Sequence, residues 1–310
     1  MGAHRGGVVV ADRIGPSLIG GGAGPVPTSP GPLPTPSMPT GLARAGDHGV
    51  AEPRVRRRYG RAIATVLIPL PDDGFDVTEV AVPWKLLTRA GHVVRFATER
   101  GGSAPAADQR LLDGVIFGKL GAAAEPQAFY REMCSDDGFR GPLAWEDVKA
   151  DEFDGLILPG GHAPGMRQYL GSESLRHKVA ELWAGDRPVG AICHGVLVLA
   201  RTCDPTTGLG LLYGRRTTCL PKYMERSAFL VSAWRLGRYY RTYPAYVEDE
   251  VRNALRGPFD FARGPRVLSR RGTEADDGPA FVVEDGRYVS ARWPGDAYLF
   301  AKRFADRLGP

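Results

Sequence analysis

The sequence contains few cysteines and no long hydrophobic run. No segment approaches the roughly 20 consecutive apolar residues that a transmembrane helix needs, so no membrane span is expected. The N-terminus lacks an apolar core of about 7–15 residues followed by a cleavage-like site, which argues against a secretory signal. The four cysteines are widely spaced and form no CxxC pair, a usage typical of a reducing compartment. We therefore expect a cytoplasmic protein with no membrane partner.

Net charge is scarce in most of the chain. Residues 1–61 hold eight arginines and three acidic residues. The whole chain has 40 basic and 35 acidic residues, so residues 62–310 have 32 of each. A neutral body argues against nucleic acid as a partner. Residues 1–61 also hold nine prolines and many glycines and lack a periodic apolar face. They predict a disordered tail, followed by one folded domain over 62–310.

From residue 63 onward, strand patterns alternate with helical patterns. Short apolar runs predict strands over 63–69, 93–98, 153–159, 188–192 and 215–220. Helical periodicity predicts helices over 77–90, 125–133, 172–184, 196–200 and 297–308, and residues 136–142 are predicted to form a loop. Two further strands, 280–284 and 288–291, should form a hairpin around Asp285-Gly286. The alternation predicts an α/β fold, with a doubly wound, mostly parallel sheet and helices on both faces.

One segment has an unusual composition. Residues 229–262 are rich in Tyr, Trp and Arg and are predicted to be helical. Such side chains can stack on a substrate or on nucleic acid, or they can pack as a lid or a dimer surface. We favour a helical lid or a dimer surface that packs these amphipathic tyrosines.

The segment around Cys193 predicts a sharp turn between a strand and a helix. An apolar run ends at Cys193-His194-Gly195, and a helical apolar pattern starts at Val196. Such a corner can expose a nucleophile above a sheet, where the helix N-terminus lowers a thiol pKa. A buried structural cysteine at the end of a strand is the alternative, because free cysteine packs as a small hydrophobic residue.

Two other strand ends bring polar or flexible residues to the same edge of the sheet. The strand over 153–159 is followed by Gly160-Gly161-His162, and paired glycines let backbone N–H groups approach a ligand closely. Glu79 follows the first strand, in the loop or in the first turn of the next helix. Ligands bind beyond the carboxyl ends of the strands in open parallel sheets. An acid, a glycine pair and a thiol are therefore expected at one edge.

Together these motifs resemble the ThiJ/PfpI superfamily, which shares the flavodoxin-like fold of class I glutamine amidotransferases. The resemblance covers roughly residues 62–308 and is nearest the glyoxalase III and chaperone branch. In chain order, it rests on Asp76-x-x-Glu79 before Pro83, Ala90-Gly-His-Val93, Leu158-Pro-Gly-Gly161, Ala191-Ile-Cys-His-Gly195, and Val289-Ser-Ala-Arg-Trp-Pro-Gly-Asp296. The family core has a shorter connection at about 101–150, so this region is interpreted as an insertion that covers the site.

The resemblance also implies roles for individual residues. Cys193 would be the nucleophile, and Glu79 the partly protonated acid hydrogen-bonded to its sulfur. Gly160, Gly161, His162 and Gly195 would form the oxyanion and substrate-binding site. No histidine follows His194, so the downstream base of a true glutamine amidotransferase is absent. His194 is then the candidate base, with Glu225 as the acid that could orient it, or it turns away from the pocket.

Three functions are compatible with these residues. The favoured hypothesis is a glyoxalase III-like enzyme, in which Cys193 adds to a small reactive carbonyl compound and a 2-oxoaldehyde becomes a 2-hydroxy acid. The alternatives are a cysteine amidase or peptidase, and a redox sensor or chaperone in which Cys193 is oxidised. We expect a small-molecule substrate and, from the resemblance, a homodimer. We expect no cofactor and no metal, because no close set of ligands can be placed.

Overall fold

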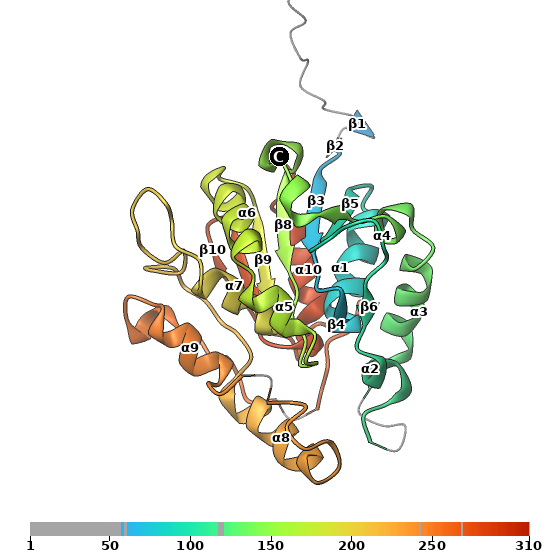
Figure 1. Ribbon diagram of the computed structural model, residues 1–310, viewed down its shortest axis with the longest axis vertical. Coiled ribbons are helices and arrows are strands. Elements are labelled where there is room, and N and C mark those ends of the chain that lie inside the picture. Colours follow the sequence, from blue (N-terminus) through green and yellow to red (C-terminus); the bar gives the residue numbers. More distant parts are fainter. Residues whose placement is uncertain (1–56, 59–60, 117–120, 242, 268, 310) are drawn as a thin grey trace, which may run out of the picture. The chain divides into compact units, whose positions relative to one another are not determined.

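The computed structural model describes residues 57–58, 61–116, 121–241, 243–267 and 269–309 (Figure 1). The chain divides into two compact units, Met1–Glu52 and Pro53–Pro310. The first unit, and with it most of the predicted disordered tail, lies outside the described residues. The second begins with a short antiparallel pair, β1 (Arg57–Arg58) and β2 (Arg61–Ala62).

None of the described helices is long and apolar enough to cross a bilayer.

The centre of the second unit is a seven-stranded sheet among the described residues, in the order β10-β11-β9-β8-β3-β5-β7. All neighbouring strands are parallel except β10, which pairs antiparallel with β11 at one edge. The strands are β3 (Thr65–Pro69), β5 (Val93–Thr98), β7 (Leu143–Ala144), β8 (Gly155–Leu158), β9 (Val189–Ile192), β10 (Val282–Asp285) and β11 (Tyr288–Ala291). The apolar residues of β8 and β9 are buried throughout, as expected for strands covered on both faces.

Helices cover both faces of this sheet, which confirms the predicted doubly wound fold. Figure 1 shows α1 and α10 behind the sheet and α5, α6 and α7 in front of it. The described helices are α1 (Val77–Arg89), α2 (Gln109–Asp113), α3 (Ala124–Met133), α4 (Asp137–Arg140), α5 (Met166–Gly171), α6 (Glu173–Ala184), α7 (Val196–Ala200), α8 (Lys222–Leu236), α9 (Val247–Asn253) and α10 (Ala297–Ala305). From β3 the chain continues to β5, toward one edge of the sheet, and from β8 it continues to β9, toward the other edge. Because crossovers between parallel strands are right-handed, the helices of these two connections lie on opposite faces.

Close contact between α10 and the sheet requires glycine in the strands. A Cβ atom at Gly190 would lie 2.7 Å from the Phe300 ring, and one at Gly155 would lie 3.0 Å from the Phe304 ring. Both phenylalanines are fully buried. The aromatic face of α10 therefore fills the space that the missing side chains leave over β8 and β9.

Two sequence-based assignments of local structure are wrong. Residues 215–220, predicted to be a strand, form only an isolated bridge between Thr217 and Phe261. The next N–H, that of Thr218, bonds to the Ser290 side chain, so no ladder continues. The predicted loop over 136–142 contains α4, because Asp136 caps the N–H of Phe139 and the Phe139 ring is buried.

The remaining segments lie beside the sheet. Within the region interpreted as an insertion, β6 (Ala106–Ala107) pairs in parallel with β4 (Asp73–Phe75), and α3 packs against α1. The aromatic-rich segment is helical only in part, since α8 begins at Lys222 and turns separate it from α9. Five short 3₁₀ helices complete the description: η1 (Trp145–Asp147), η2 (Ala150–Glu152), η3 (Cys193–Gly195), η4 (Pro258–Asp260) and η5 (Pro294–Asp296).

Candidate active site

Cys193 lies at a strained corner between β9 and α7, as the sequence predicted. It opens η3 with φ of +58°, a left-handed conformation that costs a non-glycine residue about 1–2 kcal/mol. Gly195 makes the corner possible, because a Cβ atom there would lie 2.0 Å from the carbonyl oxygen of Leu158. The Cys193 side chain is only 1% exposed. The corner therefore holds the thiol under packed residues and not open to solvent.

Glu79 reaches the thiol from the first turn of α1. Asp76 caps this helix by accepting hydrogen bonds from the backbone N–H groups of Thr78 and Glu79, at 2.8 and 3.1 Å. The fully buried Glu79 carboxyl accepts the N–H of Gly160 at 2.7 Å through Oε2, whereas its Oε1 atom has no hydrogen-bond partner in the structure. The carboxyl lies close enough to Cys193 to raise the pKa of the thiol. The structure thus brings together the acid, the glycine pair and the thiol.

The protonation of this pair differs from the sequence-based expectation. Burial, with the charge of Glu79 next in importance, raises the pKa of the Cys193 thiol, although the N–H of His194 acts in the opposite direction. Burial and the nearby Asp76 raise the pKa of Glu79 well above its usual range. Burial also raises the pKa of Asp76 to about 6. Desolvation therefore outweighs the helix N-terminus, and it favours the protonated forms of both Cys193 and Glu79.

Two histidine rings lie near the sulfur. The Nδ1 atom of His194 is 3.5 Å from Cys193 Sγ, and the His194 ring packs edge-on against His162 with centroids 4.6 Å apart. His162 in turn packs against Tyr240 at 5.2 Å. Burial lowers the pKa of His162 to about 4 and also lowers that of His194. A neutral His194 imidazole beside the thiol can accept its proton.

Glu225 lies elsewhere and is not seen to orient His194. Its carboxyl accepts the N–H of Val247 at 3.0 Å and lies 3.6 Å from Nη1 of Arg241. Burial raises its pKa to about 7, which the Val247 N–H and Arg241 oppose. Among the contacts described for Glu225, none reaches His194, so the acid tethers the segment after α8 instead.

The glycine pair is required by close backbone approaches. A Cβ atom at Gly160 would lie 2.6 Å from the N atom of His194 and 3.0 Å from Glu79 Oε2. One at Gly161 would lie 2.8 Å from the carbonyl oxygen of Gly74. Because the Gly160 N–H already binds Glu79, the neighbouring Gly161 N–H is the better candidate for an oxyanion donor.

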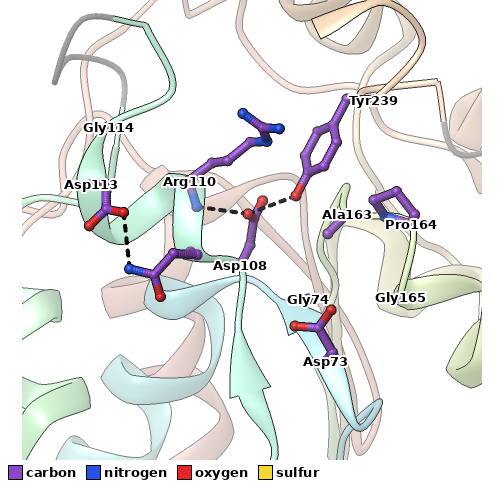
Figure 2. Close-up of a pocket in the computed structure, with 11 residues that line it drawn as sticks. Asp73, Gly74, Asp108, Arg110, Asp113, Gly114, Ala163, Pro164, Gly165 and Tyr239 are labelled. Carbon is purple, nitrogen blue, oxygen red and sulfur yellow. Dashed lines mark hydrogen bonds between the residues drawn. The ribbon is translucent and has the colours of Figure 1, made fainter.

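A cavity of about 570 Å³ lies near the segments that carry His162 and Tyr240 (Figure 2). Its lining consists of Asp73, Gly74, Asp108, Gln109, Arg110, Asp113, Gly114, Ala163, Pro164, Gly165 and Tyr239. Ala163 follows His162 directly and Tyr239 precedes Tyr240, so the lining includes chain neighbours of two rings that pack toward His194. This group could not be predicted from the sequence, because Asp73, Asp108 and Tyr239 come from three distant segments with no common motif.

The motif over 289–296 contains a buried ion pair. Arg292 and Asp296 are both fully buried and joined by two hydrogen bonds of 2.8 Å, from Nε and Nη2 to the carboxyl. Within the part of the chain that the structure describes, no three His, Cys, Asp or Glu side chains are grouped to hold a metal ion.

The fold and the elbow define an architecture like that of class I glutamine amidotransferases. Residues 70–265 match the family described as ThiJ/PfpI family-like. An uncharacterized protein from Schizosaccharomyces pombe is 32% identical over 257 residues, covering 79% of this chain and 85% of that protein. A protein from Pyrococcus abyssi named as a deglycase is 28% identical, covering 77% of this chain and 96% of that one. The chain belongs to the ThiJ/PfpI superfamily.

Among solved structures, glyoxalase III from Candida albicans has the same fold. It aligns with a TM-score of 0.51 at 17% identity, over 79% of this chain and 97% of that chain.

Proposed function

We propose that this protein is a cysteine-dependent enzyme acting on small reactive carbonyl compounds, with Cys193 as its nucleophile. The observation that supports this most directly is the position of Cys193 Sγ, which lies beside the Glu79 carboxyl and 3.5 Å from His194 Nδ1. A proton donor and a neutral base thus lie next to one sulfur atom. The relative named as a deglycase supports a carbonyl-acting enzyme of this family.

The finer proposal is the conversion of a 2-oxoaldehyde into a 2-hydroxy acid. His194 accepts the thiol proton as the sulfur adds to the aldehyde carbon, giving a hemithioacetal whose oxygen faces the Gly161 N–H. A base then moves the C1 proton to C2, which turns the adduct into a thioester of the 2-hydroxy acid. Water hydrolyses the thioester and regenerates the thiol. The sum is addition of one water to the 2-oxoaldehyde, so no cofactor is consumed.

The buried, protonated thiol fits this order of events. A resting thiolate inside packed residues would be costly, whereas proton transfer to His194 during attack forms charge only when the carbonyl oxygen can take it up. The raised pKa of Glu79 favours its protonated form, which can donate a hydrogen bond to the sulfur as it becomes an anion.

Amide hydrolysis is less well supported. No histidine follows His194 in the sequence, and the acid that could have oriented His194 is held by Val247 and Arg241. Oxidation of Cys193 in a redox sensor is the second alternative, and it requires peroxide to reach a side chain that is almost fully covered. The homodimer and the cytoplasmic location stay predictions, testable by light scattering and by imaging of a tagged chain.

Turnover of methylglyoxal to lactate without glutathione tests the proposal. We expect wild type to be active, Cys193→Ala to be inactive, and the control Cys203→Ala to match wild type, because Cys203 is an exposed free thiol. Release of ammonia from amides without any turnover of 2-oxoaldehydes would replace this function with the hydrolase. No turnover of either, with peroxide modifying Cys193 before the other thiols, would favour the sensor.

A further inference from the structure

The cavity in Figure 2 is dominated by carboxylates. Among the described residues, Asp73, Asp108 and Asp113 line it against a single basic side chain, that of Arg110. The guanidinium of Arg110 lies over the Tyr239 ring, 4.5 Å from its centroid, and it is the backbone N–H of Arg110 that bonds to Asp108 at 3.0 Å. The acidic side chains therefore outnumber the basic one, and the cavity favours positive charge.

Asp108 has one carboxylate oxygen without a donor. The residue is only 3% exposed, and its Oδ1 atom accepts both the Arg110 N–H and the Tyr239 hydroxyl, the latter at 2.8 Å. The second oxygen, Oδ2, is buried and has no hydrogen-bond partner in the structure. A buried acceptor left without a donor is costly, so a ligand that donates a hydrogen bond to Oδ2 would be stabilised here.

The aromatic ring at the edge of the cavity fits the same kind of ligand. Tyr239 holds Asp108 through its hydroxyl and already presents its ring to a guanidinium. A planar cation that bonds to Asp108 can contact an aromatic face at the same time, an arrangement common for guanidinium groups. Asp113 differs from Asp108, because its carboxyl accepts a hydrogen bond from Gln109 at 3.1 Å and lies at the rim.

We propose that this cavity binds the ammonium or guanidinium group of a ligand, with Asp108 Oδ2 as its hydrogen-bond acceptor. The lining includes the chain neighbours of His162 and Tyr240, whose rings pack toward His194 beside Cys193, so we extend the proposal to a substrate class of carbonyl compounds that carry a positive charge. This last step rests on the proposed function. Binding of the cation itself does not, because it involves neither Cys193 nor Glu79.

The test measures binding without chemistry, in the full chain with Cys193→Ala. Three probes of similar size are titrated by calorimetry or NMR at pH 7.5: propylguanidinium, neutral butyramide and anionic butyrate. We expect propylguanidinium to bind about tenfold or more tightly than butyramide, as expected for a hydrogen bond to a charged acceptor. Adding Asp108→Asn, which keeps an oxygen for Tyr239, should remove this preference. Adding the control Asp113→Asn should weaken binding by less than about threefold, because it changes only the surrounding charge.

The comparison of the three probes needs no substitution at the cavity, so it remains decisive if Asp108→Asn fails to fold. Equal binding of the probes would overturn the proposal. So would a guanidinium preference that Asp108→Asn leaves intact, or tighter binding of butyrate that is lost in Arg110→Gln. Failure of methylglyoxal turnover with the guanidinium preference intact would contradict only the proposed function.

Discussion

Gly160 donates its backbone N–H to the Glu79 carboxyl at 2.7 Å, and this bond links the loop after β8 to the first turn of α1. The contact fixes the carboxyl beside the Cys193 sulfur. It also leaves no room for a side chain at Gly160, so the geometry of the site depends on a residue that performs no chemistry.

A methyl group at Gly160 should therefore disable the site. Gly160→Ala places Cβ 2.6 Å from the N atom of His194, against backbone that cannot move freely. We expect carbonyl turnover to fall by about 100-fold and the free energy of unfolding by about 1–3 kcal/mol, measured by steady-state kinetics and denaturant titration. Gly171→Ala is the control, since nothing lies within 4 Å of its added Cβ. Equal effects of the two substitutions would contradict the packing argument.

Loss of the Glu79 proton should impair the chemistry and leave the fold intact. Glu79→Gln retains an oxygen for the Gly160 N–H but removes the acid, and we expect carbonyl turnover to fall by about 10²-fold. Stopped assays of lactate production check this. Undiminished turnover in a well-folded Glu79→Gln protein would remove Glu79 from the mechanism.

Alkylation should report the raised pKa of Cys193. Burial and Glu79 raise this pKa, so the midpoint for modification should lie above the free-thiol value of about 8.5, and Glu79→Gln should lower it. Peptide mass spectrometry after pulses of iodoacetamide separates Cys193 from the exposed Cys203 and Cys134. A midpoint below pH 7 for Cys193 would show that the helix N-terminus outweighs desolvation.

Removal of the Tyr240 ring should increase the access of reagents to Cys193. Tyr240 is buried against His162, and Tyr240→Ala should speed the alkylation of Cys193 at least several-fold at pH 8. Tyr213→Ala, at an exposed tyrosine, serves as the control and should leave the rate unchanged. An unchanged rate in Tyr240→Ala would mean that access to the thiol follows another route.

Glu225 should affect stability in a pH-dependent way and not catalysis. Its folded pKa of about 7 is raised above the ordinary 4.5, so the stability it contributes is fully present below pH 4.5 and is lost as pH rises through 7. Relative to wild type, Glu225→Gln should gain about 2–3 kcal/mol between pH 5 and pH 8, measured by denaturant titration. A large loss of turnover in this variant would restore Glu225 as the acid that orients His194.

The sequence predicted what depends on local patterns and not what depends on burial. The strand over 93–98 has the predicted bounds, and α6 begins after its Ser172 cap, because periodicity and caps are written in neighbouring residues. The direction of the Cys193 pKa shift was missed, since it is set by residues that the tertiary fold brings over the thiol. The cavity was missed for the same reason: Asp108 and Tyr239 are 131 positions apart and meet only in the folded chain.

The buried pair of Arg292 and Asp296 also connects separate segments of the chain. Asp296 accepts the N–H of Phe281 and the N–H of Arg292, while the guanidinium donates to the carbonyl of Pro265 at 2.7 Å. The segments around Pro265, Phe281 and Arg292 are thus held together by one buried ion pair. The described cysteines are all free, so no disulfide shares this role. A thiol reductant does not break an ion pair, and added salt screens a buried pair poorly. Acid that protonates Asp296 would instead weaken the hydrogen bonds to all three segments together.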